Sequence, residues 1–163
     1  MSFRNEFELR LCIWDWKSYN DGIGNWKWFD MDELDEVEDY IEELVEKGLE
    51  EAFICDYECS HKIAINNYTS VASVLNLVNS LDEIEEAIQE RIISHDIYEM
   101  GEFEEVFRDY TPTQLATVIH FGEYNPMDEY FTFDGYSNIK TLNSYEYRKL
   151  IADIESDVLS EYL

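Results

Sequence analysis

The chain has 163 residues, with 38 Asp and Glu against 11 Lys and Arg, which gives a net charge of −27 at pH 7. A charge of this size repels nucleic acids and anionic membranes, so we expect the partners to be cations or basic protein surfaces. Twelve Tyr, nine Phe and four Trp supply ample apolar surface for a core, which excludes a disordered chain.

Residues 1–62 are predicted to form an N-terminal α+β domain. Phe7 to Trp14 has the composition of a strand, and Asn20-Asp21-Gly22 is a turn signal. Trp26 to Phe29 would form a second strand, and the apolar run Ala52 to Asp56 a third. A helix over 30–47 lies between the last two strands and would pack one face on the sheet.

The predicted helix 30–47 is the most acidic segment, with nine carboxylates and no basic residue between Asp32 and Glu46. Asp30 and Glu33 predict a capping box at its start, and Gly48 a C′ glycine at its end. Its apolar residues have helical spacing and predict one buried stripe: Met31, Leu34, Val37, Tyr40, Ile41, Leu44 and Val45. As an α-helix, Asp32 to Glu46 spans about 22 Å, or about one charge per 2.4 Å. Double-stranded DNA carries about one per 1.7 Å.

Residues 63–110 are predicted to form a mostly helical, acidic middle domain. Thr69 or Ser70 would cap a short helix over 71–78, and Ser80 with Glu83 would begin a second helix that runs to about Ile93. A third helical stripe follows at Phe103, Val106 and Phe107.

Residues 111–163 are predicted to form a C-terminal helix–hairpin–helix domain. Thr111-Pro112 is an N-cap followed by an N1 proline, which begins a helix to about His120. Strands over 129–133 and 136–142 would form a hairpin at Asp134-Gly135, and Asn143 or Ser144 would cap the final helix. Together the three domains predict an α+β fold, an elongated string of small α/β subdomains with acidic outer helices.

A solvated face is the ordinary explanation for a charged helix. Exposed helices usually mix signs, however, because like charges at i,i+4 destabilise a helix by a few tenths of a kcal/mol. This sequence repeats such pairs at Asp35–Asp39, Glu38–Glu42, Asp39–Glu43 and Glu42–Glu46. The repetition indicates a use for the charge: an anionic surface that occupies a basic DNA-binding cleft.

Enzymatic and metal-binding functions have little support. Ser94-His95-Asp96 is consecutive, whereas catalytic triads combine separated residues. Segment 30–46 lacks the central glycine of an EF-hand, and Cys55, Cys59 and His61 are only half of a zinc site. We therefore expect no enzyme activity, no cofactor, no metal and free core cysteines. Three cysteines, the polar N-terminus and the lack of a long apolar run predict a cytoplasmic protein.

Several segments resemble the ArdA-type antirestriction proteins of mobile elements and phages. They cover roughly residues 8–85: Leu11-Cys12-Ile13-Trp14, Lys17 to Gly22 (KSYNDG), Gly24 to Phe29 (GNWKWF), Ala52 to Glu58 (AFICDYE) and Tyr68 to Val71 with Leu75-Asn76. The resemblance implies a DNA mimic, an elongated and usually dimeric protein that fills the DNA-binding groove of Type I restriction–modification enzymes.

We therefore expect a non-enzymatic DNA mimic in the host cell cytoplasm, a homodimer that binds such an enzyme without binding nucleic acid or membrane itself. The alternative is an anti-CRISPR or another acidic inhibitor or interaction module, which binds a basic protein surface without true DNA mimicry. The carboxylates expected to stand in for phosphates are Asp32, Glu33, Asp35, Glu36, Glu38, Asp39, Glu42, Glu43, Glu46, Asp82, Glu83, Glu85, Glu86, Glu90, Glu102, Glu104 and Glu105.

Overall fold

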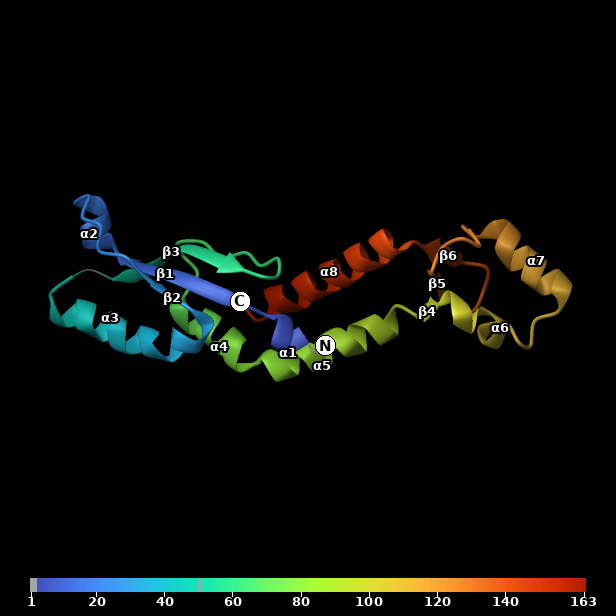
Figure 1. Ribbon diagram of the computed structural model, residues 1–163, viewed down its shortest axis with the longest axis horizontal. Helices are drawn as coiled ribbons and strands as arrows, with labels where there is room; N and C mark the ends of the chain where they lie inside the picture. The colour runs from blue at the N-terminus through green and yellow to red at the C-terminus, as the bar shows by residue number, and fades with distance from the viewer. Residues whose placement is uncertain (1–2, 50) are drawn as a thin grey trace. The chain divides into compact units, whose positions relative to one another are not determined.

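The computed structural model describes residues 3–49 and 51–163, and it separates into two compact units (Figure 1). Unit 1 contains residues up to Glu85 together with Glu155–Leu163, and unit 2 contains Glu86–Ile154. Both units combine helices with a small antiparallel sheet, so the predicted α+β class is confirmed. The division into three domains at 62/63 and 110/111 stays a prediction.

Unit 1 is built on a three-stranded sheet of order β2-β1-β3. Its strands are β1 (Leu9–Asp15), β2 (Lys27–Phe29) and β3 (Ala52–Cys59), all antiparallel. The alternation of Leu9, Leu11 and Ile13 buries one face of β1, each with at most 1% exposure. The predicted strand–turn–strand–helix–strand order is therefore confirmed, although β3 is longer than expected.

The acidic segment is not one α-helix, as was predicted. It begins as a 3₁₀ helix, η1 (Met31–Glu36), and continues as α3 (Val37–Glu46). The predicted capping box is present, with the Glu33 carboxylate accepting the backbone N–H of Asp30 at 3.2 Å. Gly48, at φ +74°, is in the left-handed conformation expected of a C′ glycine.

The segment contacts the core of unit 1 through part of the predicted stripe. Leu34, Val37 and Leu44 are at most 3% exposed, and the ring of Tyr40 lies 5.3 Å from that of Phe29 on β2. Val45 was expected in the buried stripe but is 64% exposed. At about 3.6 residues per turn, Val45 is rotated by about 80° from Val37 around α3, whereas Leu44 is within about 20° of it, so Val45 lies outside the buried face.

The remaining helices of unit 1 include two that were not predicted, α1 (Phe3–Glu6) and α2 (Trp16–Asn20). The helix predicted over 71–78 is α4 (Val71–Asn79), capped by Ser70, whose hydroxyl accepts the Ser73 N–H at 3.0 Å. Two longer helices contain residues of both units, α5 (Leu81–Ser94) and α8 (Ser144–Glu161).

Unit 2 contains a second sheet of order β4-β5-β6. Its strands are β4 (Ile97–Glu99), β5 (Tyr130–Phe133) and β6 (Ile139–Leu142), all antiparallel. Strand β4 was not predicted. The turn η2 (Met100–Glu102) and the one-turn helix α6 (Phe103–Val106) replace the longer helical stripe expected there.

Packing in unit 2 is dominated by aromatic rings. Phe107, Phe131 and Phe133 are buried, and α7 (Pro112–Phe121) adds Val118 to the same cluster. Thr111 caps α7 as predicted, its hydroxyl accepting the Gln114 N–H at 3.1 Å. None of the helices within the described ranges is long and apolar enough to cross a membrane.

The loop between β5 and β6 has five residues, 134–138, instead of the predicted two-residue turn. The Asp134 carboxylate closes it by accepting the Tyr136 N–H at 3.0 Å and the Asn138 side-chain amide at 2.7 Å. The hydrogen bonds from Asn138 and Tyr136 lower the pKa of Asp134. The Asn143 side chain caps α8, accepting the Glu146 N–H at 2.8 Å.

We predict that Asp15→Ala lowers the free energy of unfolding by about 1–3 kcal/mol. The Asp15 side chain is fully buried and accepts the Ser18 N–H at 2.8 Å and the Asn25 side-chain amide at 3.2 Å. Its removal leaves both donors unpaired. Urea unfolding followed by circular dichroism measures the change.

The matched control is Asp21→Ala, since Asp21 is exposed and its carboxylate pairs with the exposed Lys17 at 3.2 Å. This control is expected to change stability by less than about 0.5 kcal/mol. Equal stabilities for the two variants would contradict a structural role for Asp15.

Candidate functional site

The first set of predicted phosphate-mimicking acids lies together on η1 and α3. Eight of the nine side chains between Asp32 and Glu46 are exposed, and Glu33 is half-buried because it caps η1. Leu34, Val37 and Leu44 face the core on the other side. Within 3–49 and 51–163, the recorded ion pairs give these nine acids no Lys or Arg partner. The segment therefore presents uncompensated negative charge to solvent.

The 3₁₀ start changes the spacing of this charge. A 3₁₀ helix rises about 2.0 Å per residue and an α-helix about 1.5 Å, so Asp32 to Glu46 spans about 25 Å. Nine acids over that length give about one charge per 2.8 Å, looser than the value predicted for a continuous α-helix. One DNA strand carries one phosphate per about 3.4 Å, and the duplex one per about 1.7 Å. The segment alone thus has a line charge between those of one strand and a duplex.

The second predicted set is divided between the two units. Asp82, Glu83 and Glu85 belong to unit 1, whereas Glu86, Glu90, Glu102, Glu104 and Glu105 belong to unit 2. All are exposed except Glu85, which is half-buried.

Three carboxylates of the second set have ion-pair or hydrogen-bond partners that were not predicted from the sequence. Asp82 pairs with Arg4 at 2.7 Å, and Glu105 lies 3.9 Å from Arg108. The Glu102 carboxylate accepts the Glu99 N–H at 2.9 Å. These contacts reduce the free negative charge of the second set relative to the first.

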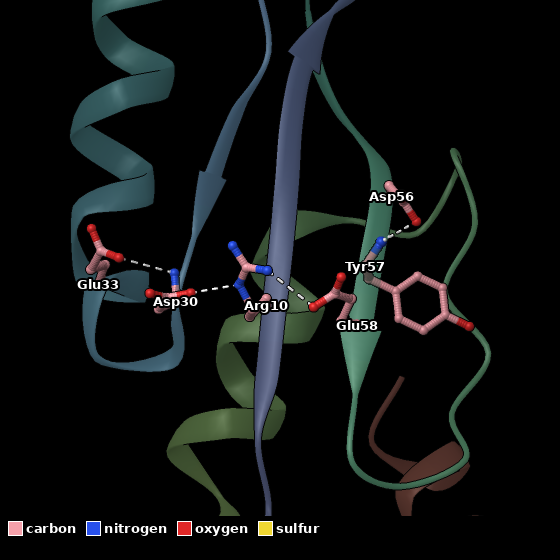
Figure 2. A network of polar contacts seen from close by, with 6 residues as sticks. All are labelled: Arg10, Asp30, Glu33, Asp56, Tyr57 and Glu58. Atoms are coloured by element: carbon pink, nitrogen blue, oxygen red, sulfur yellow. Dashed lines mark hydrogen bonds and ion pairs between the residues drawn. The ribbon is translucent and has the colours of Figure 1, made fainter.

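Arg10 is the basic centre of a polar network at the edge of the acidic segment (Figure 2). Its Nε donates to Asp30 at 2.6 Å and its Nη1 to Glu58 at 3.0 Å, while the guanidinium lies 4.9 Å from the centre of the Trp28 ring. These hydrogen bonds, to Asp30 first and then Glu58, raise the pKa of Arg10. Arg10 thus joins η1, β1 and β3 where carboxylates converge.

Three carboxylates at this edge could face a cation, since ligand oxygens of Asp30, Asp32 and Glu33 lie within 4.8 Å of one another. Asp30 is already paired with Arg10, and Glu33 accepts the Asp30 N–H. A divalent ion would therefore compete with Arg10 for the same oxygens.

His61 links the C-terminal helix to the start of the chain. Its Nε2 lies 3.0 Å from Glu155 on α8, its Nδ1 lies 2.8 Å from the Ser60 hydroxyl, and its ring packs against Phe3 and Phe7. The Ser60 hydroxyl also accepts the Glu8 N–H at 2.8 Å. The ring packing on Phe3 and Phe7 and the contact with Glu155 indicate a structural role for His61. This side chain holds the C-terminal part of α8 in unit 1.

The cysteines are free, as predicted. Cys12 is buried, and the Cys55 thiol donates to the Cys12 carbonyl oxygen at 3.4 Å. Burial raises the pKa of Cys12 to about 12 and also raises the pKa values of Cys55 and Cys59. Because the thiolate is the reactive form, these side chains are poor nucleophiles near neutral pH.

We predict that all three thiols react slowly with iodoacetamide at pH 7.5 in the folded protein and rapidly in urea. The raised pKa values keep the thiols protonated at this pH, so reactivity rises only as pH approaches those values or as the chain unfolds. Mass spectrometry of timed samples measures the modification. Fast labelling of Cys12 in the folded state would contradict its burial.

We also predict that Arg10→Met lowers the melting temperature more at 20 mM than at 500 mM NaCl, two conditions whose Debye lengths differ about fivefold. The substitution leaves Asp30 and Glu58 without their cation, and salt screens the resulting repulsion. Arg108→Met is the matched control, because its contact with Glu105 is 3.9 Å long and exposed. A shift for Arg10→Met that is independent of salt would contradict an electrostatic role.

In a comparison with known families, residues 11–158 match the model described as "Antirestriction protein (ArdA)". Neither the comparison with curated proteins nor that with solved structures returns a match. The family match extends beyond residues 8–85, over which the sequence segments resemble this family, and covers most of both units. Members of this family inhibit restriction enzymes rather than act as enzymes themselves. The chain belongs to the ArdA family of antirestriction proteins.

Proposed function

We propose that this protein inhibits a Type I restriction–modification enzyme by occupying its DNA-binding groove as a mimic of DNA. The single observation that carries the proposal is the exposed, uncompensated row of acids on η1 and α3. DNA-binding grooves are lined with Lys and Arg and gain affinity by releasing counterions from the phosphates. Carboxylates held on a rigid helix release counterions in the same way.

The apolar side of the segment makes this row of charge rigid. Leu34, Val37 and Leu44 are buried beneath it, and the capping box and Gly48 fix its two ends. A flexible acidic tail would lose conformational entropy on binding, whereas this segment is already ordered. Rigidity thus favours competition with a stiff ligand such as duplex DNA.

The size of the charge sets the length of DNA that one chain could replace. At two phosphates per base pair, 27 negative charges correspond to about 13 base pairs, and a homodimer to about twice that length. We propose that the active form is a homodimer in the host cell cytoplasm, where restriction enzymes meet incoming DNA. The acids of the second set would add their negative charge to that of η1 and α3.

The alternative, an acidic inhibitor of a CRISPR nuclease or of another basic protein without DNA geometry, is supported by the looser charge spacing of the segment. At about 2.8 Å per charge, η1 and α3 alone do not reach the density of a duplex. The two functions differ in one respect: a true mimic excludes duplex DNA from its partner, whereas an inhibitor that binds elsewhere does not.

We predict that Glu38→Lys combined with Glu42→Lys weakens binding to a Type I enzyme by about 100-fold or more, as expected for close charge pairs at an interface. Both side chains are exposed on α3, so the variant is expected to remain folded. Isothermal titration with the purified enzyme measures affinity, and circular dichroism verifies folding.

The matched control is Asp153→Lys with Asp157→Lys, two exposed acids at the same i,i+4 spacing on α8. It changes the net charge by the same amount, so it separates a local contact from a general loss of charge. Equal affinities for the α3 variant and the α8 variant would show that η1 and α3 are not the contact surface.

A further inference from the structure

A groove with a volume of about 660 Å³ lies in unit 1 between α3, the start of β3 and the loop that precedes α4. Trp16 and Phe53 lie among its lining residues, stacked with their ring centroids 3.8 Å apart and their planes 11° from parallel. Ile41 and Val45 of α3 and Tyr68 of the loop also line it. The groove is therefore mainly apolar and aromatic, in a protein whose surface is otherwise dominated by carboxylates.

Two of these apolar side chains are strongly exposed, Tyr68 at 91% and Val45 at 64%. Local hydrogen bonds order the loop around Tyr68: the Asn66 side-chain oxygen accepts the Tyr68 N–H at 2.8 Å, and the Thr69 hydroxyl accepts the Asn66 N–H at 3.0 Å. An exposed tyrosine on an ordered turn loses little entropy when a partner covers it. Such side chains are frequent anchors in protein interfaces.

The charge of the groove is negative. Among its described lining residues, Glu51 is the charged one, and its backbone carbonyl accepts the Trp16 N–H at 3.2 Å. This hydrogen bond places Glu51 next to the Trp16–Phe53 stack. Glu46, exposed on α3, directly follows Val45 in the sequence. Phe53 is 4% exposed and its ring face is covered by Trp16, so the rings open to a partner are those of Trp16 and Tyr68, beside the Glu51 carboxylate.

We propose that this groove binds an arginine side chain of the restriction enzyme, from a basic segment that adjoins the DNA-binding groove. The proposal rests on the proposed function, because Ile41 and Val45 lie on the same helix as the phosphate-mimicking acids Glu42 and Glu46. The planar guanidinium stacks on aromatic rings and pairs with carboxylates, and the apolar stem covers hydrophobic surface.

An arginine bound in this groove gives the inhibitor a contact that DNA lacks. Binding through charge alone weakens steeply as salt rises, whereas an aromatic contact in a groove is much less sensitive to salt. With both kinds of contact on one helix, the protein would retain affinity for its target at ionic strengths where phosphate-type contacts are weakened. The groove thereby distinguishes the target enzyme from other basic proteins.

The first test compares Val45→Lys with Val45→Glu in binding to the intact Type I enzyme. A cationic occupant predicts opposite behaviour: Val45→Lys weakens binding by about tenfold or more, and Val45→Glu stays within about threefold of the unsubstituted protein. Ile23→Lys and Ile23→Glu are the matched controls, since Ile23 is an apolar residue of unit 1 with 56% exposure that does not line the groove. Both controls are expected to stay within about threefold.

The second test removes the aromatic contact without changing charge. Tyr68→Ala is expected to weaken binding by about tenfold, and Tyr68→Phe, which keeps the ring, to restore it. The slope of log affinity against log salt should be the same for Tyr68→Ala and the unsubstituted protein, because no charge is lost. Tyr145→Ala, at a tyrosine of 75% exposure on α8, is the matched control and should bind normally.

Equal losses for Val45→Lys and Val45→Glu would indicate an apolar occupant and overturn the proposal, as would unchanged affinity for Tyr68→Ala. If the groove variants change the self-association of the protein, measured by sedimentation, but not its affinity for the enzyme, the groove binds a second copy of the chain. This result would also overturn the proposal. The charge reversal at Glu38 and Glu42 tests the proposed function separately. If that variant loses binding and the groove variants do not, only the arginine site is wrong.

Discussion

The structure depends on one electrostatic constraint: 38 carboxylates must remain hydrated and separated while a small apolar core forms beneath them. Amphipathic helices satisfy this constraint: in α3, Val37 and Leu44 are buried and the acids are exposed. At one point where carboxylates converge, a basic side chain separates them: Arg10 pairs with both Asp30 and Glu58. Among the described residues, negative charge without a Lys or Arg partner is concentrated on η1 and α3, the surface that we propose contacts the target enzyme.

Much of the fold could be predicted because its helices begin at strong local signals. Thr111-Pro112, Ser70 and Asn143 each supply a side chain that caps the backbone of the following helix, and such contacts depend on a few neighbouring residues. Strand β4 was missed because three residues carry too little periodicity, and only their pairing with β5 defines them. The 3₁₀ start of the acidic segment was missed because apolar spacing does not distinguish it from an α-helix.

The sequence predicted that the carboxylates of the candidate site are exposed, but not which of them form ion pairs. A run of acids with one apolar stripe must place its charges outward, so the surface of η1 and α3 followed from composition. The contact between Arg4 and Asp82 joins residues 78 apart in sequence, which no local pattern indicates. The groove lined by Tyr68 likewise combines four separate segments: Trp16, the part of α3 with Ile41 and Val45, the start of β3 and the loop before α4.

The central claim is that the protein and DNA occupy the same groove of the target enzyme. The most direct measurement is an equilibrium titration of a purified Type I enzyme with this protein, repeated at rising concentrations of a duplex that carries the enzyme's recognition sequence. Occupation of a shared groove predicts strict competition, in which the apparent dissociation constant of this protein rises in proportion to duplex concentration without reaching a plateau. A plateau, or a stable complex that contains enzyme, duplex and this protein together, would contradict it.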